Sequence, residues 1–121
     1  MRKPIFSVDA QKDIVSIQEV SLREYGEDGV IRYTKLIEAT LRHLLEEGIP
    51  PFGATEQPLG YYSYHLRNLR KQVSHKGVQV KRPCHLIFFK ITDDTLYVAR
   101  ILHDSWDFPK HLEFIDFQDE D

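Results

Sequence analysis

The sequence predicts an α+β fold in which an antiparallel helical hairpin packs on one face of a mostly antiparallel sheet. Apolar residues recur at helical spacing through residues 10–25 and again through residues 30–47. Two stretches rich in β-branched and aromatic residues, 84–91 and 96–102, follow with a short Asp-containing turn between them. The 121 residues suffice for one domain, residues 1–121, and are too few for two independent cores.

The first half of the chain predicts one strand and two helices. Ile5, Phe6 and Val8 form a short apolar strand, and Asp9 is a good N-cap for the helix that follows. That helix ends near Gly26, and residues 26–29 form a turn before the second helix. Because the link has only about four residues, the two helices must pack side by side and antiparallel.

The sequence of the second half of the chain predicts the remaining strands of the sheet. Residues 48–64 contain six Gly and Pro, a density that excludes regular structure and predicts a loop. Residues 65–72 predict a strand, and residues 73–83 a hairpin loop centred on residues 75–77. The strands 84–91 and 96–102 form a hairpin, after which residues 103–112 leave the sheet. Residues 113–121 form an acidic tail, which is either a disordered solubilising end or a cover over basic residues.

The net charge of −3 hides a strong asymmetry along the chain. Residues 57–92 carry seven Lys or Arg and no acid, whereas residues 1–56 sum to −3 and residues 93–121 to −7. This basic segment can face an acidic peptide, a phosphate backbone or the chain's own tail, or it can be a solvated face. On a strand at 65–72, Arg67 and Arg70 would lie on opposite faces, so only one of them would meet a partner.

Short catalytic motifs are missing from the sequence. It contains no GxGxxG, P-loop, HExxH or CxxC pattern. The His and Asp side chains within residues 103–111 could hold a metal ion, but capping or solvated groups are the better interpretation. Cys84 and His85 are adjacent, so on a strand they would point to opposite faces and could not share a proton. We therefore predict no cofactor and no metal site.

Three tyrosines, Tyr61, Tyr62 and Tyr64, come just before the predicted strand at 65–72. Aromatic side chains among positive charges can stack on nucleic-acid bases. Tyrosines that follow a Pro-Leu-Gly turn more often close a loop over a core, and we favour that interpretation.

The location of the protein is predicted from missing signals. No apolar run approaches the roughly 20 residues that span a bilayer. The N-terminal segment meets a carboxylate at Asp9 where a signal peptide would continue its apolar stretch. The sequence therefore predicts a cytoplasmic protein with no membrane partner.

Several segments together resemble the RelE/ParE superfamily of bacterial type II toxins, on its ParE-like side. The matching stretches are FSVDAQKDIVSI, IRYTKLIEATLRHLLEEGIPPFG, HLRNLRKQ and, most specifically, HLIFFKITDDTLYVARILHDSWDFPKHL. They occur in the family's order and cover about residues 4–112. The resemblance implies a curved sheet, and it implies a cognate antitoxin, a small acidic protein whose C-terminal segment wraps across the toxin.

Two activities occur in the superfamily. ParE-like members inhibit DNA gyrase, and the RelE branch cleaves messenger RNA in the ribosome. We predict a ParE-like gyrase inhibitor that is not an enzyme and is neutralised by its antitoxin. The residues predicted to bind antitoxin or target are Arg67, Arg70, Arg100, His103, Trp106 and Phe108, of which Arg70, Arg100 and His103 match ParE-like positions.

The alternative is a RelE-like, ribosome-dependent endoribonuclease. Its candidate catalytic residues are Arg67, Arg70, Lys71, Arg82 and His85, which would supply phosphate-binding charge and acid-base groups. The position that resembles the RelE strand arginine is His85, and no Tyr follows Tyr97 where the RelE branch has one near its C-terminus. Both differences count against cleavage of RNA.

Overall fold

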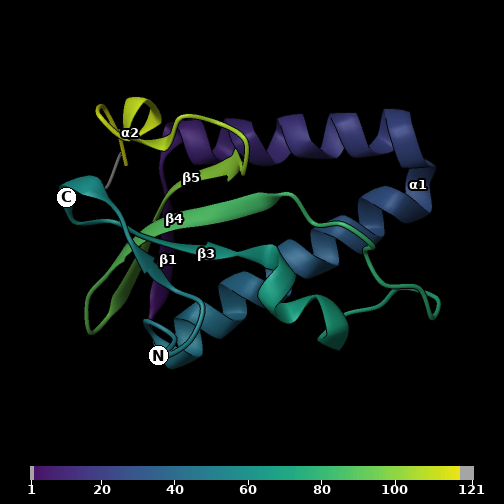
Figure 1. Ribbon diagram of the computed structural model, residues 1–121, viewed down its shortest axis with the longest axis horizontal. Coiled ribbons are helices and arrows are strands. Elements are labelled where there is room, and N and C mark those ends of the chain that lie inside the picture. Colours follow the sequence, from purple (N-terminus) through teal and green to yellow (C-terminus); the bar gives the residue numbers. More distant parts are fainter. Residues whose placement is uncertain (1, 118–121) are drawn as a thin grey trace.

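The computed structural model describes residues 2–117, in which a kinked helix lies along one face of a five-stranded sheet (Figure 1). The strands are β1 (Lys3–Phe6), β2 (Thr55–Glu56), β3 (Tyr62–His65), β4 (His85–Ile91) and β5 (Thr95–His103). The helices are α1 (Val8–Glu47) and the single turn α2 (Phe108–His111), with 3₁₀ helices η1 (Pro58–Gly60) and η2 (Leu66–Gln72). The predicted α+β class is confirmed.

The sheet has the order β1-β5-β4-β3-β2. Only β1 pairs in parallel, with β5, and every other neighbouring pair is antiparallel. The β4–β5 hairpin predicted from the sequence is confirmed, and a bulge between Phe88 and Phe89 bends it locally. Because β1 joins the far side of β5, the first and last strands of the chain lie side by side, and the helix that follows β1 crosses back over the sheet.

The helix α1 is two helical limbs joined at Gly26, which is the helical hairpin that the sequence predicts. The first limb is capped by Ser7, whose side chain accepts a hydrogen bond from the Ala10 amide at 2.8 Å and donates one to the Ala99 carbonyl. The predicted cap at Asp9 is therefore wrong, because the strand ends earlier and Asp9 already lies in the first helical turn. Among the described residues, no helix is both long and apolar enough to cross a membrane.

The predicted four-residue turn is shorter in the structure, because Gly26 alone breaks the helix with φ 76° and ψ −171°. This region of backbone space is open almost only to glycine. We expect Gly26→Ala to lower the free energy of unfolding by about 1–2 kcal/mol, because a Cβ strains this backbone whatever the space around it. Urea denaturation measures the loss, and an unchanged midpoint would show that the kink relaxes freely.

Two sequence predictions in the middle of the chain are wrong. Residues 48–64 are not an irregular loop throughout, because β2 and β3 pair within them and complete the edge of the sheet. Residues 66–72 are the 3₁₀ helix η2 and not a strand. The buried residues Leu66 and Leu69 are three apart, which is the repeat of a 3₁₀ helix, and His65 Nδ1 accepts the Arg67 amide to start it.

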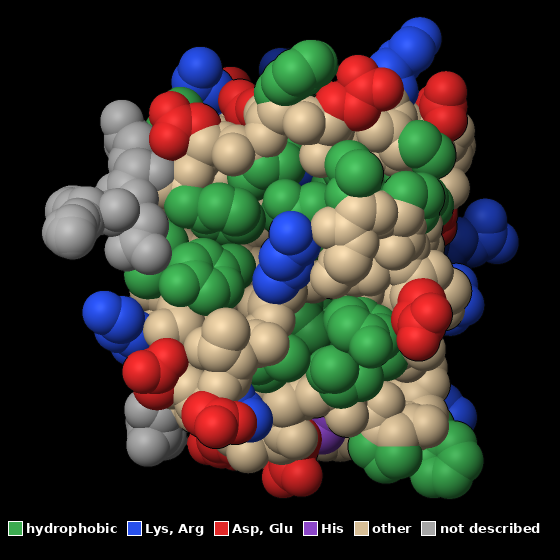
Figure 2. Space-filling view, turned by 90° about the vertical axis from the view of Figure 1, so that its left-hand side faces the viewer, with side chains coloured by type: hydrophobic (Ala, Val, Ile, Leu, Met, Phe, Trp, Pro, Cys, Tyr) green, Lys and Arg blue, Asp and Glu red, His purple; other side chains and the backbone are tan. Residues whose placement is uncertain are grey.

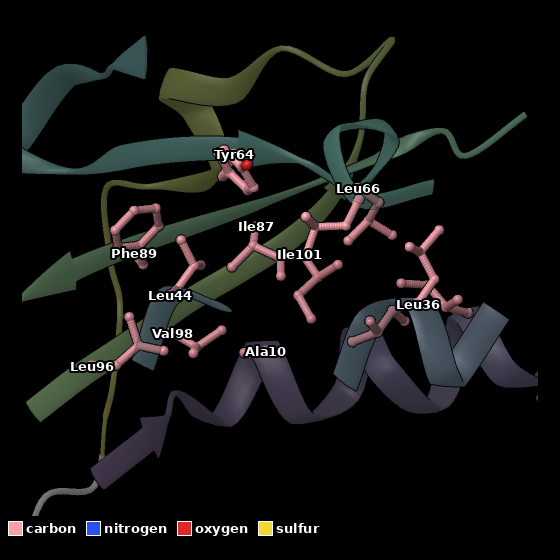
Figure 3. Packing of buried hydrophobic residues seen from close by; sticks show 13 residues of the cluster. Ala10, Leu36, Leu44, Tyr64, Leu66, Ile87, Phe89, Leu96, Val98 and Ile101 are labelled. Carbon is pink, nitrogen blue, oxygen red and sulfur yellow. The ribbon is translucent and has the colours of Figure 1, made fainter. Parts of the chain in front are cut away.

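The main core lies between α1 and the sheet. Figure 3 shows Leu36 and Leu44 from the helix facing Ile87, Val98 and other buried side chains of the strands. Burial of these side chains gives the domain most of its stability. Tyr64 belongs to this core and Tyr61 to the cluster on the outer face, so the interpretation of the tyrosines as packing residues is confirmed.

The outer face of the sheet is covered by the C-terminal segment. Ile115 and Phe117 pack on a second buried cluster there, and the Phe117 ring lies 5.3 Å from that of Tyr97. The Asp116 carbonyl also accepts the Val8 amide at 2.9 Å, which satisfies one free amide at the start of α1. Residues 118–121, which include three of the tail's acidic groups, lie outside the described residues.

The two ends of the molecule differ in character. Figure 2 shows the end opposite the kink of α1, where hydrophobic side chains gather in the middle of the face and most charged side chains lie around its edges. The other end carries the kink, the loop 73–83, the start of β4 and the end of β5 (Figure 1). The large cleft of the protein opens there.

Candidate functional site

A cleft of about 890 Å³ lies between the two limbs of α1, the loop after η2 and the last residues of β5. Most of its wall is apolar, and these lining residues are Ile17, Val20, Tyr25, Tyr33, Val78, Val80, Cys84, Ile101 and Trp106. The wall also carries charged and imidazole groups, which are Asp13, Glu24, Arg32, Lys81, Arg82, His85 and His103. A smaller groove of about 360 Å³ between β1 and the second limb of α1 holds no comparable cluster of titratable groups.

The loop that walls the cleft is a tight hairpin, as the sequence predicts, with a bridge between His75 and Val78. It is fastened to α1 through Asp28, which lies 3.2 Å from His75 Nε2 and 3.3 Å from Lys76 Nζ. Hydrogen bonds from Lys76 and His75 lower the pKa of the Asp28 carboxyl below its usual value. Asp28 is a long-range anchor that no local pattern reveals.

Tyr33, Cys84 and His85 meet at one place on the cleft wall. Tyr33 Oη accepts the Cys84 amide at 3.1 Å and lies 2.6 Å from His85 Nδ1. The Cys84 sulfur is 3.5 Å from the same imidazole nitrogen, so the expectation that these two side chains point apart is wrong. The reason is that Cys84 precedes β4, and the alternation of a strand does not apply to it.

Burial keeps this group of three side chains uncharged near neutral pH. It raises the pKa of the Cys84 thiol and of the Tyr33 hydroxyl, and it lowers the pKa of His85 to about 4. The nearby His103 lowers the pKa of His85 further, since two imidazolium ions would repel each other. The site therefore offers a neutral imidazole and a protonated thiol, not a thiolate nucleophile.

A second polar pair lies behind the cleft. His65 is buried, and its Nδ1 accepts the Arg67 amide, so Nε2 carries the hydrogen that it donates to Asp104 Oδ2 at 3.0 Å. This bond lowers the pKa of the Asp104 carboxyl. The His85 and His103 rings lie edge to face with centroids 5.6 Å apart, and His103 Nδ1 accepts the Ser105 amide. The fold thus gathers three histidines that are far apart in the sequence.

The structure separates the predicted binding residues. His103 and Trp106 line the cleft, and Trp106 is 47% exposed with its ring tilted against that of His111, at a centroid distance of 5.0 Å. Phe108 instead packs on Phe88 on the outer face of the sheet, with ring centroids 4.8 Å apart. Arg67 is exposed on η2 outside the cleft, and Arg70 donates from Nε to the Lys81 carbonyl at 3.0 Å. Because a 3₁₀ helix has three residues per turn, Arg67 and Arg70 share one side of η2, and the prediction of opposite faces is wrong.

Arg100 is engaged inside the protein. Its Nε and Nη2 donate to the two carboxylate oxygens of Asp13 at 2.8 and 2.9 Å, a bidentate ion pair whose side chains are 14% and 12% exposed. Asp13 also accepts the Ile101 amide at 3.0 Å, which ties the first limb of α1 to β5. The pair raises the pKa of Arg100 above its ordinary value. The sequence did not single out Asp13, because no local pattern distinguishes this residue from the other polar residues of a helix.

Of the residues proposed for the catalytic alternative, only Arg82 and His85 line the cleft. Arg67, Arg70 and Lys71 lie together on η2 outside it. Within residues 2–117, no three His, Cys, Asp or Glu side chains are close enough to hold a metal ion.

The low pKa of His85 predicts a pH dependence of stability. Its folded value of about 4 lies below the ordinary value of 6.5, so between these pH values the unfolded chain binds a proton that the folded chain does not. The contribution of neutral His85 to the free energy of unfolding is therefore complete above pH 6.5, and it is lost as the pH falls toward 4. We expect it to be about 1–2 kcal/mol, less than the full shift implies because the ring is partly open to water. Urea melts of wild type and His85→Gln between these pH values measure it, and equal slopes would contradict the assignment.

The kinked helical hairpin over this sheet is a fold shared with solved structures of ParE and YafQ toxins. A chain of the chromosomal ParDE TA system from P. aeruginosa superposes with a TM-score of 0.62 at 13% identity, over 85% of this chain and 96% of that chain. YafQ from E. coli strain BL21(DE3) gives 0.55 at 16% identity, and a YafQ variant from E. coli with one histidine replaced by glutamine gives 0.51 at 14%; both comparisons cover 87% of this chain and 96% of the other. No protein-family model and no curated relative matches the sequence.

Proposed function

We propose that this protein is the toxin of a type II toxin-antitoxin pair and that it acts in the cytoplasm as a ParE-like inhibitor that binds DNA gyrase. The observation that carries the proposal is the cleft, whose mostly apolar wall ends at the half-exposed Trp106. Apolar surface with an aromatic anchor and a charged rim is typical of a surface that binds another protein. The shared fold supports the toxin class, and the ParDE neighbour supports the ParE-like branch.

The state of the proton-transfer groups also favours binding over catalysis. His65 uses both ring nitrogens in hydrogen bonds within the protein. His85 bonds Tyr33, and its low pKa leaves it a weak base near neutral pH. Arg100, which was predicted to bind antitoxin or target, is already paired with Asp13 and is not free to stabilise phosphate charge. A protein inhibitor needs none of these groups to react.

The cognate antitoxin is the second proposed partner. Arg67 and Lys71 are exposed on η2, and Arg70 lies with them, so this helix offers a basic surface to an acidic segment. Charges of this kind mainly speed association, whereas apolar contacts hold the complex. Trp106 and the cleft would supply such contacts, and Phe108 would contribute through the packing of α2.

The proposal predicts the outcome of two assays on the purified chain. We expect it to inhibit negative supercoiling of a relaxed plasmid by gyrase, and to leave messenger RNA intact in a translating ribosome extract. The Trp106→Ala variant is the matched comparison, and we expect it to inhibit gyrase more weakly than wild type. Codon-dependent cleavage of the message with supercoiling unaffected would replace this proposal by the RelE-like alternative.

One observation favours that alternative. His85, His103 and Arg82 line the same cleft, so an imidazole pair and a guanidinium could face one phosphate. If the ribosome extract shows cleavage, His103→Ala should abolish it while Lys71→Ala, on η2 outside the cleft, should not.

A further inference from the structure

Five cations gather on two adjoining segments beside the cleft. Of the seven Lys and Arg within residues 57–92, Lys76 pairs with Asp28 and Lys90 lies over the Tyr61 ring. Within residues 2–117, the other five form no ion pair with a carboxylate. We call these five residues the basic ridge, and they are Arg67, Arg70 and Lys71 on η2 with Lys81 and Arg82 on the loop 73–83.

Hydrogen bonds hold the two segments of the basic ridge side by side. Arg70 donates from Nε to the Lys81 carbonyl at 3.0 Å, and the Gln79 side chain donates to the Lys71 carbonyl, also at 3.0 Å. All residues of the basic ridge except Arg70 are exposed. Like charges held close together repel each other, and a ligand with several negative charges in a row relieves that repulsion.

The acidic residues elsewhere in the chain do not cancel this surface. The net charge is −3, but at physiological ionic strength charges more than about 8 Å apart are largely screened from each other. Asp104 lies near the start of η2, and its carboxylate is already engaged by His65 Nε2. The cleft is less suitable for a polyanion, because Asp13 and Glu24 are part of its wall. A row of phosphates therefore fits the basic ridge better than it fits the cleft.

The surroundings of the basic ridge favour a duplex over a single strand. Proteins that bind single strands combine cations with a row of aromatic side chains on which successive bases stack. Neither η2 nor the loop 73–83 contains a Phe, Tyr or Trp. Phe52 is an exposed ring near η2, since its neighbour Gly53 lies against the Asn68 side chain, but one ring does not form a row. Asn68 and Gln72 are exposed amides on η2, and such groups hydrogen-bond phosphate and sugar oxygens.

We propose that the basic ridge binds the phosphate backbone of duplex DNA. The ridge adjoins the cleft, because Lys81 and Arg82 belong to both. The chain can therefore hold a protein in the cleft and DNA beside it, as a complex of gyrase with its DNA requires. This inference rests on the proposed function for the identity of that protein, whereas the DNA contact has its own test. An acidic antitoxin segment on η2 would compete with the DNA for the same cations.

Fluorescence anisotropy of a labelled DNA duplex measures the contact. We would titrate the full chain into a duplex of about 20 base pairs at NaCl concentrations from about 50 to 200 mM. We expect saturable binding, with a slope of log affinity against log salt of about −3 to −4, because each phosphate that is contacted contributes about −0.9. Two duplexes of different sequence should bind equally, since contacts to the backbone carry no sequence information.

Variants locate the contact on η2. The double change Arg67→Gln and Lys71→Gln should weaken binding by about 10-fold or more at low salt and make the slope shallower by about 2, because two phosphate contacts are lost. The matched control, Lys12→Gln with Arg23→Gln, removes the same charge from exposed positions on the first limb of α1, and it should bind within about 2-fold of wild type. Thermal melts verify that each variant is folded. If the η2 double variant does not fold, Arg67→Gln alone should still make the slope shallower by about 1.

Four results would overturn the inference. They are no saturable binding at the lowest salt, a slope shallower than about −1, equal binding by the η2 variant and its control, or tighter binding of a single-stranded oligoribonucleotide that is lost with Phe52→Ala. The last would assign the basic ridge to a single strand. Inhibition of gyrase without duplex binding would refute this inference alone, and duplex binding without inhibition of gyrase would refute only the proposed target.

Discussion

Replacing Asp13 with alanine should lower the free energy of unfolding by about 3–4 kcal/mol. The carboxylate forms a bidentate pair with Arg100 and also accepts the Ile101 amide, and both side chains of the pair are largely buried. Removing it leaves the Arg100 guanidinium with only the long contact from Nη1 to the His111 carbonyl at 3.5 Å, and it removes the acceptor of the Ile101 amide. A partner lost from a buried ion pair costs far more than the pair itself contributes, because the remaining charge is uncompensated.

Urea denaturation at neutral pH measures this effect, with Glu19→Gln as the matched control. Glu19 is an exposed acid on the same limb of α1, and its substitution should change stability by less than about 0.5 kcal/mol. Adding Arg100→Met to Asp13→Ala should recover much of the loss, because the double variant no longer buries an unpaired charge. A loss below about 1 kcal/mol for Asp13→Ala would mean that solvent reaches the pair freely.

Replacing Trp106 with alanine should raise the concentration that half-inhibits gyrase by about 30-fold or more, if the cleft surface is the contact. Trp106 is half-exposed, so truncation removes little buried surface from the free protein while it removes an aromatic anchor from the interface. The folded chain should therefore keep nearly its full thermal stability while it loses inhibition.

The control for Trp106 is Phe52→Ala. Phe52 is an even more exposed aromatic side chain, and it is not among the residues that line the cleft. Its removal should leave inhibition within about 2-fold of wild type, since isolated exposed apolar residues are ordinary surface. Equal loss in both variants would indicate non-specific hydrophobic binding, and no loss in either would move the gyrase contact away from the cleft.

The basic segment shows how charge along a sequence differs from charge in space. Residues 57–92 look like one basic block, but the fold divides it among η2, the loop 73–83 and β4. Lys76 pairs with Asp28, and Lys90 lies over the Tyr61 ring with its Nζ 4.5 Å from the ring centroid. A partner would therefore contact a smaller set of basic residues, which lie on η2 and at the rim of the cleft.

The helical hairpin and the β4–β5 hairpin were predictable because their information is local. Apolar spacing of three and four residues determines which face of α1 is buried, and a dense run of β-branched and aromatic residues determines a strand. Where local patterns are ambiguous, prediction failed. The spacing of Leu66 and Leu69 fits both a frayed strand and a 3₁₀ helix, and the capping bond from His65 decided between them.

The sequence by itself determined the class of the fold, the break at Gly26 and the position of Trp106 beyond the last strand. Only the tertiary structure decided the cleft and its chemistry, because its pairs join residues that are 39 to 87 positions apart: His65 with Asp104, Tyr33 with His85, and Asp13 with Arg100. These contacts depend on the register of the strands and on where α1 crosses the sheet. No local sequence pattern specifies the strand register or the crossing of α1. The unpaired Nε of Arg32 is likewise visible only in the folded structure, where its neighbours are known.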